Sequence, residues 1–188
     1  MAPSEQLDYQ IKTIRGLIAN TSADQMGNST PCDKWAVRDL MMHLVGGGQM
    51  FGMALKGEPV AMDEGAPAPD LLGDDPLAAW DGACKTFREG IDSPGALDRV
   101  VTLPFGEMPG SVVLEILRVD LLVHAWDLAQ ATDQPFDPPA EVVQAALDAA
   151  PMIIAPPLRD AGLFGAEVTA PATARPMEQL AAFAGRSV

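Results

Sequence analysis

Basic side chains are scarce in this chain of 188 residues, where 12 Lys and Arg stand against 26 Asp and Glu and give a formal net charge of −14 at pH 7. Such a surface repels the phosphate backbone of nucleic acids and anionic membrane surfaces, so we expect neither as a partner. Long apolar runs are missing as well, because Asp and His interrupt even the densest one, Val112–Leu128. The first residues have neither the basic start nor the apolar stretch of a secretory signal. The sequence therefore predicts a cytoplasmic protein.

Cysteines and aromatic residues are also few. Cys32 and Cys84 lie far apart and lack the paired spacing of zinc ribbons, which favours reduced intracellular thiols. With six Phe, three Trp and one Tyr, the core must be packed mainly with aliphatic side chains and Met, as is typical of helices rather than sheets. At 188 residues the chain is long enough to bury its own core, and we expect a single domain over residues 1–188.

Apolar residues recur every three or four positions in six segments, which is the period of an amphipathic helix. These segments cover approximately residues 7–18, 36–56, 77–91, 111–131, 138–150 and 177–184. The fourth segment is apolar almost all the way round and belongs in the middle of a bundle. The sequence therefore predicts a mainly all-α helical bundle.

Several stretches depart from this helical period. Gly46–Gly48 interrupt the second segment and need a reason, such as a kink or the close approach of another helix. Gly57–Pro76, rich in Pro and Gly, reads as a surface loop, and the β-branched segment Arg99–Phe105 as an extended piece or a small hairpin. The prolines at 151, 156 and 157 should limit regular structure there. Residues from about 160 to 188 are expected to form an extended strap that ends in a short docked helix.

The chain has two histidines, and both fall in helical segments that we place in the core. Asp120 lies four residues before His124, so their side chains project from one helical face, one turn apart, where one metal ion would reach both. Asp127 lies one turn further along this otherwise apolar stripe. A buried imidazole needs a partner for each ring nitrogen, which a metal ion and a second acceptor would supply. His43, Asp120 and His124 are therefore candidate metal ligands, and Asp127 is a candidate for orienting an imidazole.

A purely structural interpretation is open for the same residues. Asp120 and Asp127 would then face solvent or pair with Arg118 and Lys side chains, while both histidines would be hydrogen-bonded core groups. Asp127 fits equally well as a group that orients an imidazole and as the partner of a basic residue. Cys32 is either a thiol-handling residue or a small buried hydrophobe, and Trp35 is a core or pocket-wall residue. The spacing of Asp120 and His124 alone does not decide between these interpretations.

Two stretches carry a resemblance to a known family. The sequence TPCDKWAVRDLMMHLVGG begins at Thr30, and the sequence RVDLLVHAWDLAQATD begins at Arg118. Both resemble motifs of the DinB-like metal-binding four-helix proteins, in particular the mycothiol-dependent maleylpyruvate isomerase branch. The likeness lies in Pro-Cys-x-x-Trp before a helix with His followed by Gly, in a second helix ending His-Ala-Trp-Asp, and in a tail ending Ala-Gly-Arg. These features are spread from Thr30 to Arg186.

The resemblance implies an up-down four-helix bundle with short extra helices, in which His43, Asp120 and His124 hold one divalent metal ion. Two imidazoles and one carboxylate suit zinc first, with nickel or iron as alternatives, and leave coordination positions open. The expected function is a metal-dependent transferase or isomerase that combines a small thiol such as mycothiol with an electrophilic substrate, as a monomer or homodimer. A metal-dependent hydrolase and a non-catalytic metal- or partner-binding bundle are the alternatives.

The chain departs from the isomerase branch in two respects. Asp120 stands where that branch typically has Glu, so the carboxylate is one methylene shorter and the ion would have to lie closer to the helix. The chain also looks too short to carry the additional C-terminal domain of the true isomerases. Their specific reaction is therefore not carried over to this sequence.

Overall fold

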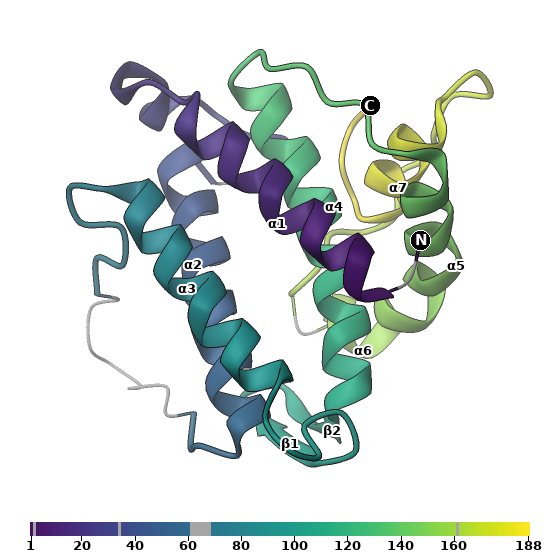
Figure 1. Ribbon diagram of the computed structural model, residues 1–188. Coiled ribbons are helices and arrows are strands. Elements are labelled where there is room, and N and C mark those ends of the chain that lie inside the picture. Colours follow the sequence, from purple (N-terminus) through teal and green to yellow (C-terminus); the bar gives the residue numbers. More distant parts are fainter. Residues whose placement is uncertain (2, 34, 61–68, 161) are drawn as a thin grey trace. The chain divides into compact units, whose positions relative to one another are not determined.

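The computed structural model describes residues 1, 3–33, 35–60, 69–160 and 162–188, which form helices and one small hairpin (Figure 1). The elements are α1 (Pro3–Ala19), a 3-10 helix (Ala23–Gly27), α2 (Val37–Lys56), α3 (Pro76–Ile91), β1 (Val100–Leu103), β2 (Gly106–Pro109), α4 (Gly110–Ala131), α5 (Ala140–Ile153), α6 (Pro156–Asp160) and α7 (Pro176–Phe183). The mainly helical class predicted from the sequence is confirmed. Residues 61–68 of the predicted loop lie outside the described residues.

The chain divides into two compact units, and each is considered by itself. The first comprises Met1–Leu40 and Ile116–Val188, and the second comprises Met41–Glu115. The boundaries fall within α2 and α4. A single domain over residues 1–188 stays a prediction.

The core of the first unit surrounds the second half of α4. Gln10 of α1 donates a hydrogen bond from Nε2 to the carbonyl of Arg118 on α4, over 2.7 Å, and α1 lies beside α4 (Figure 1). On α4, α5 and α7 a single hydrophobic cluster is buried, which includes Val119, Leu122, Val123, Trp126, Val142, Val143, Ala146, Ile153, Leu180 and Ala181. The predicted strap is also present before α7, where Val168 N donates to the carbonyl of Ala182 over 2.9 Å. The apolar period of α4 thus places this helix in the centre of the unit.

The prolines at 151, 156 and 157 interrupt helical structure less than the sequence analysis predicted. Helix α5 continues through Pro151 to Ile153, because the buried stripe of Ala146, Ala150 and Ile153 extends to its last turn. Proline at this position removes one amide donor near the helix end, and the burial of Ile153 offsets that loss. Pro156 opens the short helix α6, since proline is favoured at the first helical position. The 3-10 helix at Ala23–Gly27 was not predicted at all.

In the second unit, glycines allow α2 and α3 to approach each other closely. Helix α2 runs unbroken through Gly46–Gly48, so these glycines do not end or interrupt it. A Cβ atom on Gly48 would lie 3.2 Å from the Cβ of Ala83, and one on Gly52 would lie 2.6 Å from the carbonyl oxygen of Thr86. A Cβ on Gly90 of α3 would lie 2.5 Å from the carbonyl oxygen of Gly52. The close approach of α3, one of the two predicted reasons, therefore explains Gly48 and Gly52 but not Gly47, where a Cβ would have no contact closer than 3.9 Å.

The hairpin of the second unit follows α3. Strands β1 and β2 pair antiparallel, with Val101 opposite Met108 and Leu103 opposite Gly106. Gly106 has a φ of 135°, a backbone conformation that favours glycine, and it allows the tight reversal. The predicted extended segment near Arg99–Phe105 is thus one strand of a hairpin. Within the described part of the chain, no helix is long and apolar enough to cross a membrane.

Candidate functional site

Helix α4 carries three titratable side chains on one stripe of the first unit, because Asp120, His124 and Asp127 follow each other at intervals of four and three residues. His124 is buried, with 5% of its surface exposed, and Asp127 is fully buried. Their neighbours on the helix, Val123 and Leu128, are buried hydrophobic residues. Buried ionisable groups are expensive unless they are paired, so their partners decide what the stripe does.

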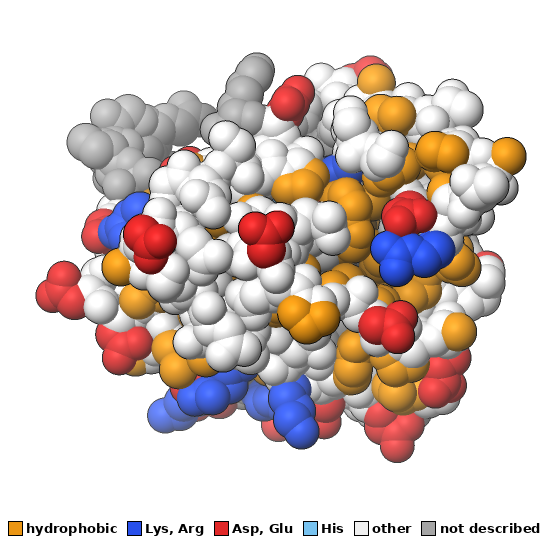
Figure 2. All heavy atoms as spheres, turned by 90° about the horizontal axis from the view of Figure 1, so that it is seen from above, with side chains coloured by type: hydrophobic (Ala, Val, Ile, Leu, Met, Phe, Trp, Pro, Cys, Tyr) orange, Lys and Arg blue, Asp and Glu red, His pale blue; other side chains and the backbone are white. Residues whose placement is uncertain are grey.

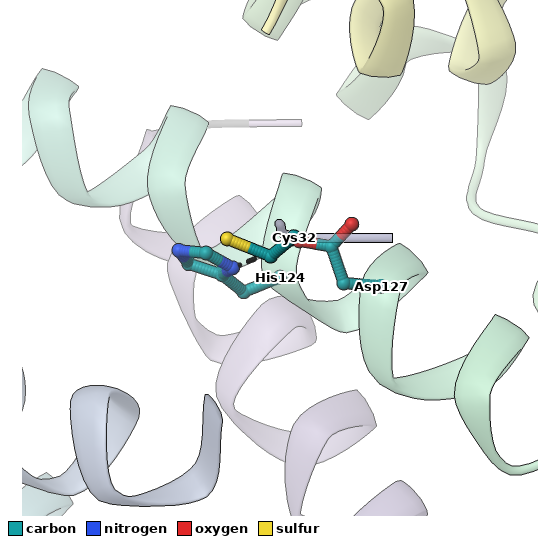
Figure 3. Close-up of side chains that lie close together, drawn as sticks. All are labelled: Cys32, His124 and Asp127. Atoms are coloured by element: carbon teal, nitrogen blue, oxygen red, sulfur yellow. Dashed lines mark hydrogen bonds and ion pairs between the residues drawn. The ribbon is translucent and has the colours of Figure 1, made fainter. Parts of the chain in front are cut away.

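Asp127 is paired on two sides. Its Oδ2 atom lies 3.0 Å from Nδ1 of His124, a contact marked by the dashed line in Figure 3. Arg186, in the tail after α7, donates from Nη2 to the same oxygen over 2.8 Å and from Nε to Oδ1 over 3.2 Å. Burial by itself raises the pKa of Asp127, but the hydrogen bonds from His124 and Arg186 outweigh it and hold the pKa below its usual value. Asp127 is therefore an ionised link between the imidazole and the tail.

The second nitrogen of His124 faces another carboxylate. Nε2 lies 3.4 Å from Oδ1 of Asp120, whose side chain is 17% exposed. Burial lowers the pKa of His124, but the charge of Asp120 and the hydrogen bonds to Asp120 and Asp127 raise it further, to about 9. Without a metal ion, His124 is therefore an imidazolium held between two carboxylates at neutral pH.

The Asp120 and His124 pair fits a metal ion by its chemistry and its spacing. Zinc binds imidazole nitrogen and carboxylate oxygen at about 2.0–2.2 Å, so two ligand atoms on a tetrahedral ion lie roughly 3.4 Å apart. The distance between Asp120 Oδ1 and His124 Nε2 is 3.4 Å. The contact of Nδ1 with Asp127 holds the His124 ring so that Nε2 faces Asp120. In metal sites, a carboxylate on the second ring nitrogen orients a metal-bound histidine in the same way.

A turn before α2 covers one side of His124. Thr30 shapes it, because the Thr30 hydroxyl accepts from Cys32 N over 3.2 Å and the Thr30 amide donates to the carbonyl of Trp35 over 3.0 Å. The Trp35 ring stacks on His124 with centroids 5.6 Å apart and planes 26° apart. The ligand atoms of Cys32, His124 and Asp127 lie within 4.8 Å of one another (Figure 3). Burial raises the pKa of the Cys32 thiol to about 11, so this thiol is protonated at neutral pH.

The candidate residues therefore differ in how they are placed. Asp120, His124 and Asp127 lie together in the first unit, whereas His43 lies on α2 in the second, and its role as a ligand stays a prediction. Asp127 does not face solvent. It contacts the imidazole of His124 and also forms an ion pair with a basic residue, but that residue is Arg186 and not Arg118. Arg118 donates to Gln6 of α1 instead.

Arg186 is the site residue that the sequence analysis did not single out. It is the last residue of the Ala-Gly-Arg motif in the tail, and it is 59 positions from Asp127. Its position three residues beyond a buried, alanine-rich helix was the available signal, because a basic residue that is buried there needs an acidic partner.

Comparison with known proteins identifies the family. Residues 7–129 match the pattern described as the mycothiol maleylpyruvate isomerase N-terminal domain. The chain belongs to this family. The family is DinB-like, which confirms the resemblance found in the sequence and the mainly helical fold that it implied. The match includes Asp120, His124 and Asp127 and ends before the segment that contributes Arg186.

The relatives of the chain add no described activity. Two uncharacterised proteins of Mycobacterium tuberculosis, from strains CDC 1551 / Oshkosh and ATCC 25618 / H37Rv, are each 38% identical to it over 175 residues. The matches cover 92% of this chain and 91% of each relative, so they extend beyond the family domain. No solved structure matches the chain.

Proposed function

We propose that this protein binds one divalent metal ion through His43, Asp120 and His124. The observation that carries the proposal is the imidazole of His124, whose Nδ1 contacts a buried carboxylate while its Nε2 lies 3.4 Å from Asp120. The resemblance of the α2 motif to the DinB-like proteins supports His43 as the third ligand. A set of two imidazoles and one carboxylate favours zinc, with nickel and iron as the other candidates.

We further propose that the metal site works with a low-molecular-weight thiol such as mycothiol and an electrophilic substrate, in a transfer or an isomerisation. Membership in the mycothiol isomerase domain family supports this choice. When bound, the ion would hold the thiol as its thiolate near neutral pH. Asp127 orients the His124 ring, and Trp35 covers its face. A thiol-dependent reaction and two unbridged cysteines suit the reducing cytoplasm, and we expect a monomer or homodimer.

The activity is tested by incubating the zinc-loaded full-length chain with mycothiol and a panel of electrophiles, namely maleylpyruvate, an epoxide and an alkyl halide. We expect loss of the thiol or isomerisation of the substrate that requires both the metal and mycothiol. Chelator-treated protein is the control for the metal, and omission of mycothiol is the control for the thiol. Turnover without mycothiol would favour a hydrolase instead, and a bound metal without any turnover would favour a non-catalytic bundle.

The affinity for zinc should rise about tenfold per pH unit between pH 7 and 8. His124, with a pKa of about 9, is protonated in this range, so a metal ion must displace one proton to reach Nε2. The same proton should appear as a buffer-dependent heat in calorimetric titrations run in two buffers with different ionisation enthalpies. A zinc affinity that does not change over this range would contradict the assignment of His124 as a ligand.

A further inference from the structure

A cavity lies in the first unit among α5, the strap and α7, and no residue of α4 lines it. It has a volume of about 390 Å³, and its apolar wall includes Leu147 of α5, Val168 of the strap and Phe183 of α7. Pockets for small ligands usually start near 300 Å³. All the residues around it follow residue 129, so it belongs to the part of the chain outside the family match. This cavity is therefore a feature added to the family domain.

The polar groups of the cavity are mainly hydrogen-bond acceptors. The polar residues of its lining are Glu167, Thr169 and Gln179, and all three are exposed at its rim. Glu167 forms no hydrogen bond or ion pair with any described residue. Gln179 uses its Nε2 to donate to the carbonyl of Ala174 over 2.9 Å, which leaves its Oε1 as an acceptor. A carboxylate and an amide oxygen beside an apolar wall suit a ligand that brings donors and positive charge.

Two arginines of this region, Arg159 and Arg175, bind groups other than Glu167. Arg159 lies over the Phe183 ring, with its guanidinium 5.1 Å from the centroid, and it donates to the carbonyls of Gly165 and Phe183. Arg175 pairs with Glu178 over 2.8 Å. The net charge of the chain is −14, and acidic side chains are spread over the face shown in Figure 2. The net charge of the chain therefore favours a cation over an anion.

We propose that this cavity binds a small amphipathic amine, in which an ammonium group contacts Glu167 and an aromatic or branched aliphatic body packs on Leu147, Val168 and Phe183. An ammonium has three donors, which match the acceptors of Glu167 and Gln179. The apolar body gains by burial against the wall. This site is separate from the metal centre, and its function does not depend on the metal or on a thiol.

The proposal is tested by titrating the full-length chain with 2-phenylethylammonium and following backbone amide shifts by NMR at low salt. We expect saturable shifts at Glu167–Ala170 and Phe183, and weaker binding of the uncharged 2-phenylethanol and the anionic 3-phenylpropanoate. Glu167→Gln should raise the dissociation constant of the ammonium about fivefold to tenfold and leave that of the alcohol unchanged. Glu58→Gln, which removes one negative charge from an exposed position in the second unit, is the matched control and should change neither.

A second variant tests the cavity itself. Ala170→Phe places a large side chain in the cavity, and we expect it to abolish the shifts for the ammonium and the alcohol, while the zinc affinity stays unchanged. Equal affinities for the ammonium and the alcohol would overturn the proposal. So would a Glu167→Gln effect no larger than that of Glu58→Gln, or shifts confined to other parts of the molecule. Because zinc binding is measured separately, failure here is distinguishable from failure of the proposed metal site.

Discussion

Arg186→Met should lower the free energy of unfolding by about 3–5 kcal/mol, which is the usual cost of breaking a buried ion pair by removing one partner. Asp127 has no exposed surface, and Arg186 is its cationic partner from the tail, at 2.8 Å. Without the guanidinium, the carboxylate keeps only the contact with His124. The measurement is a urea denaturation series on metal-free protein at pH 7, because bound zinc would add its own stabilisation.

Two further variants control for other causes of this loss. Arg175→Met removes an arginine from an exposed pair with Glu178, and it should change stability far less than Arg186→Met does. The double variant Asp127→Leu, Arg186→Met removes both charges and should recover part of the lost stability. A loss after Arg186→Met that matches the loss after Arg175→Met would mean that the Asp127 carboxylate does not need its partner.

His124→Ala should weaken zinc binding more than 100-fold, since it removes the imidazole that the site is built around. Asp127→Asn should weaken it only about 10–100-fold, the range for groups that orient a metal ligand without touching the metal. The difference tests the two roles, because Asp127 contacts Nδ1 of His124 while Nε2 faces Asp120. Competition with a chromophoric chelator measures both affinities on the same scale.

A Cys32 variant tests on which side of the His124 ring the metal ion binds. Its sulfur, His124 and Asp127 have ligand atoms within 4.8 Å of one another, so a thiol-containing site on the Nδ1 side of the ring is the geometric competitor. If the ion lies on the Nε2 side as proposed, Cys32→Ser should leave the zinc affinity within about twofold, while Asp120→Asn lowers it strongly. The reverse order of these two effects would move the ion to the Cys32 side.

Much of this arrangement was predictable from local sequence patterns. The apolar period places α4 in the core, and the four-residue spacing puts Asp120 and His124 on one face. These features depend on residues close together in the sequence. The contact of Nδ1 with Asp127 was foreseen as one of two roles for that carboxylate.

Other features depend on tertiary contacts, which the local pattern does not contain. Arg186 meets Asp127 across 59 positions, and only the docking of α7 brings them together. The continuation of α5 through Pro151 depends on the burial of Ile153, which a local proline rule does not include. The Trp35 stack on His124 likewise depends on how the turn at Thr30 folds.

The ion pair between Asp127 and Arg186 also affects which fourth ligand a metal ion at His124 would favour. The two charges cancel, and Asp120 then contributes the net negative charge beside His124. If a divalent ion were bound by neutral histidines and Asp120, one positive charge would remain, and a fourth ligand with one negative charge would neutralise it. A thiolate would supply that charge, and so would a hydroxide formed when bound water loses its proton, so a thiol would compete best when it loses its proton more readily than that water does.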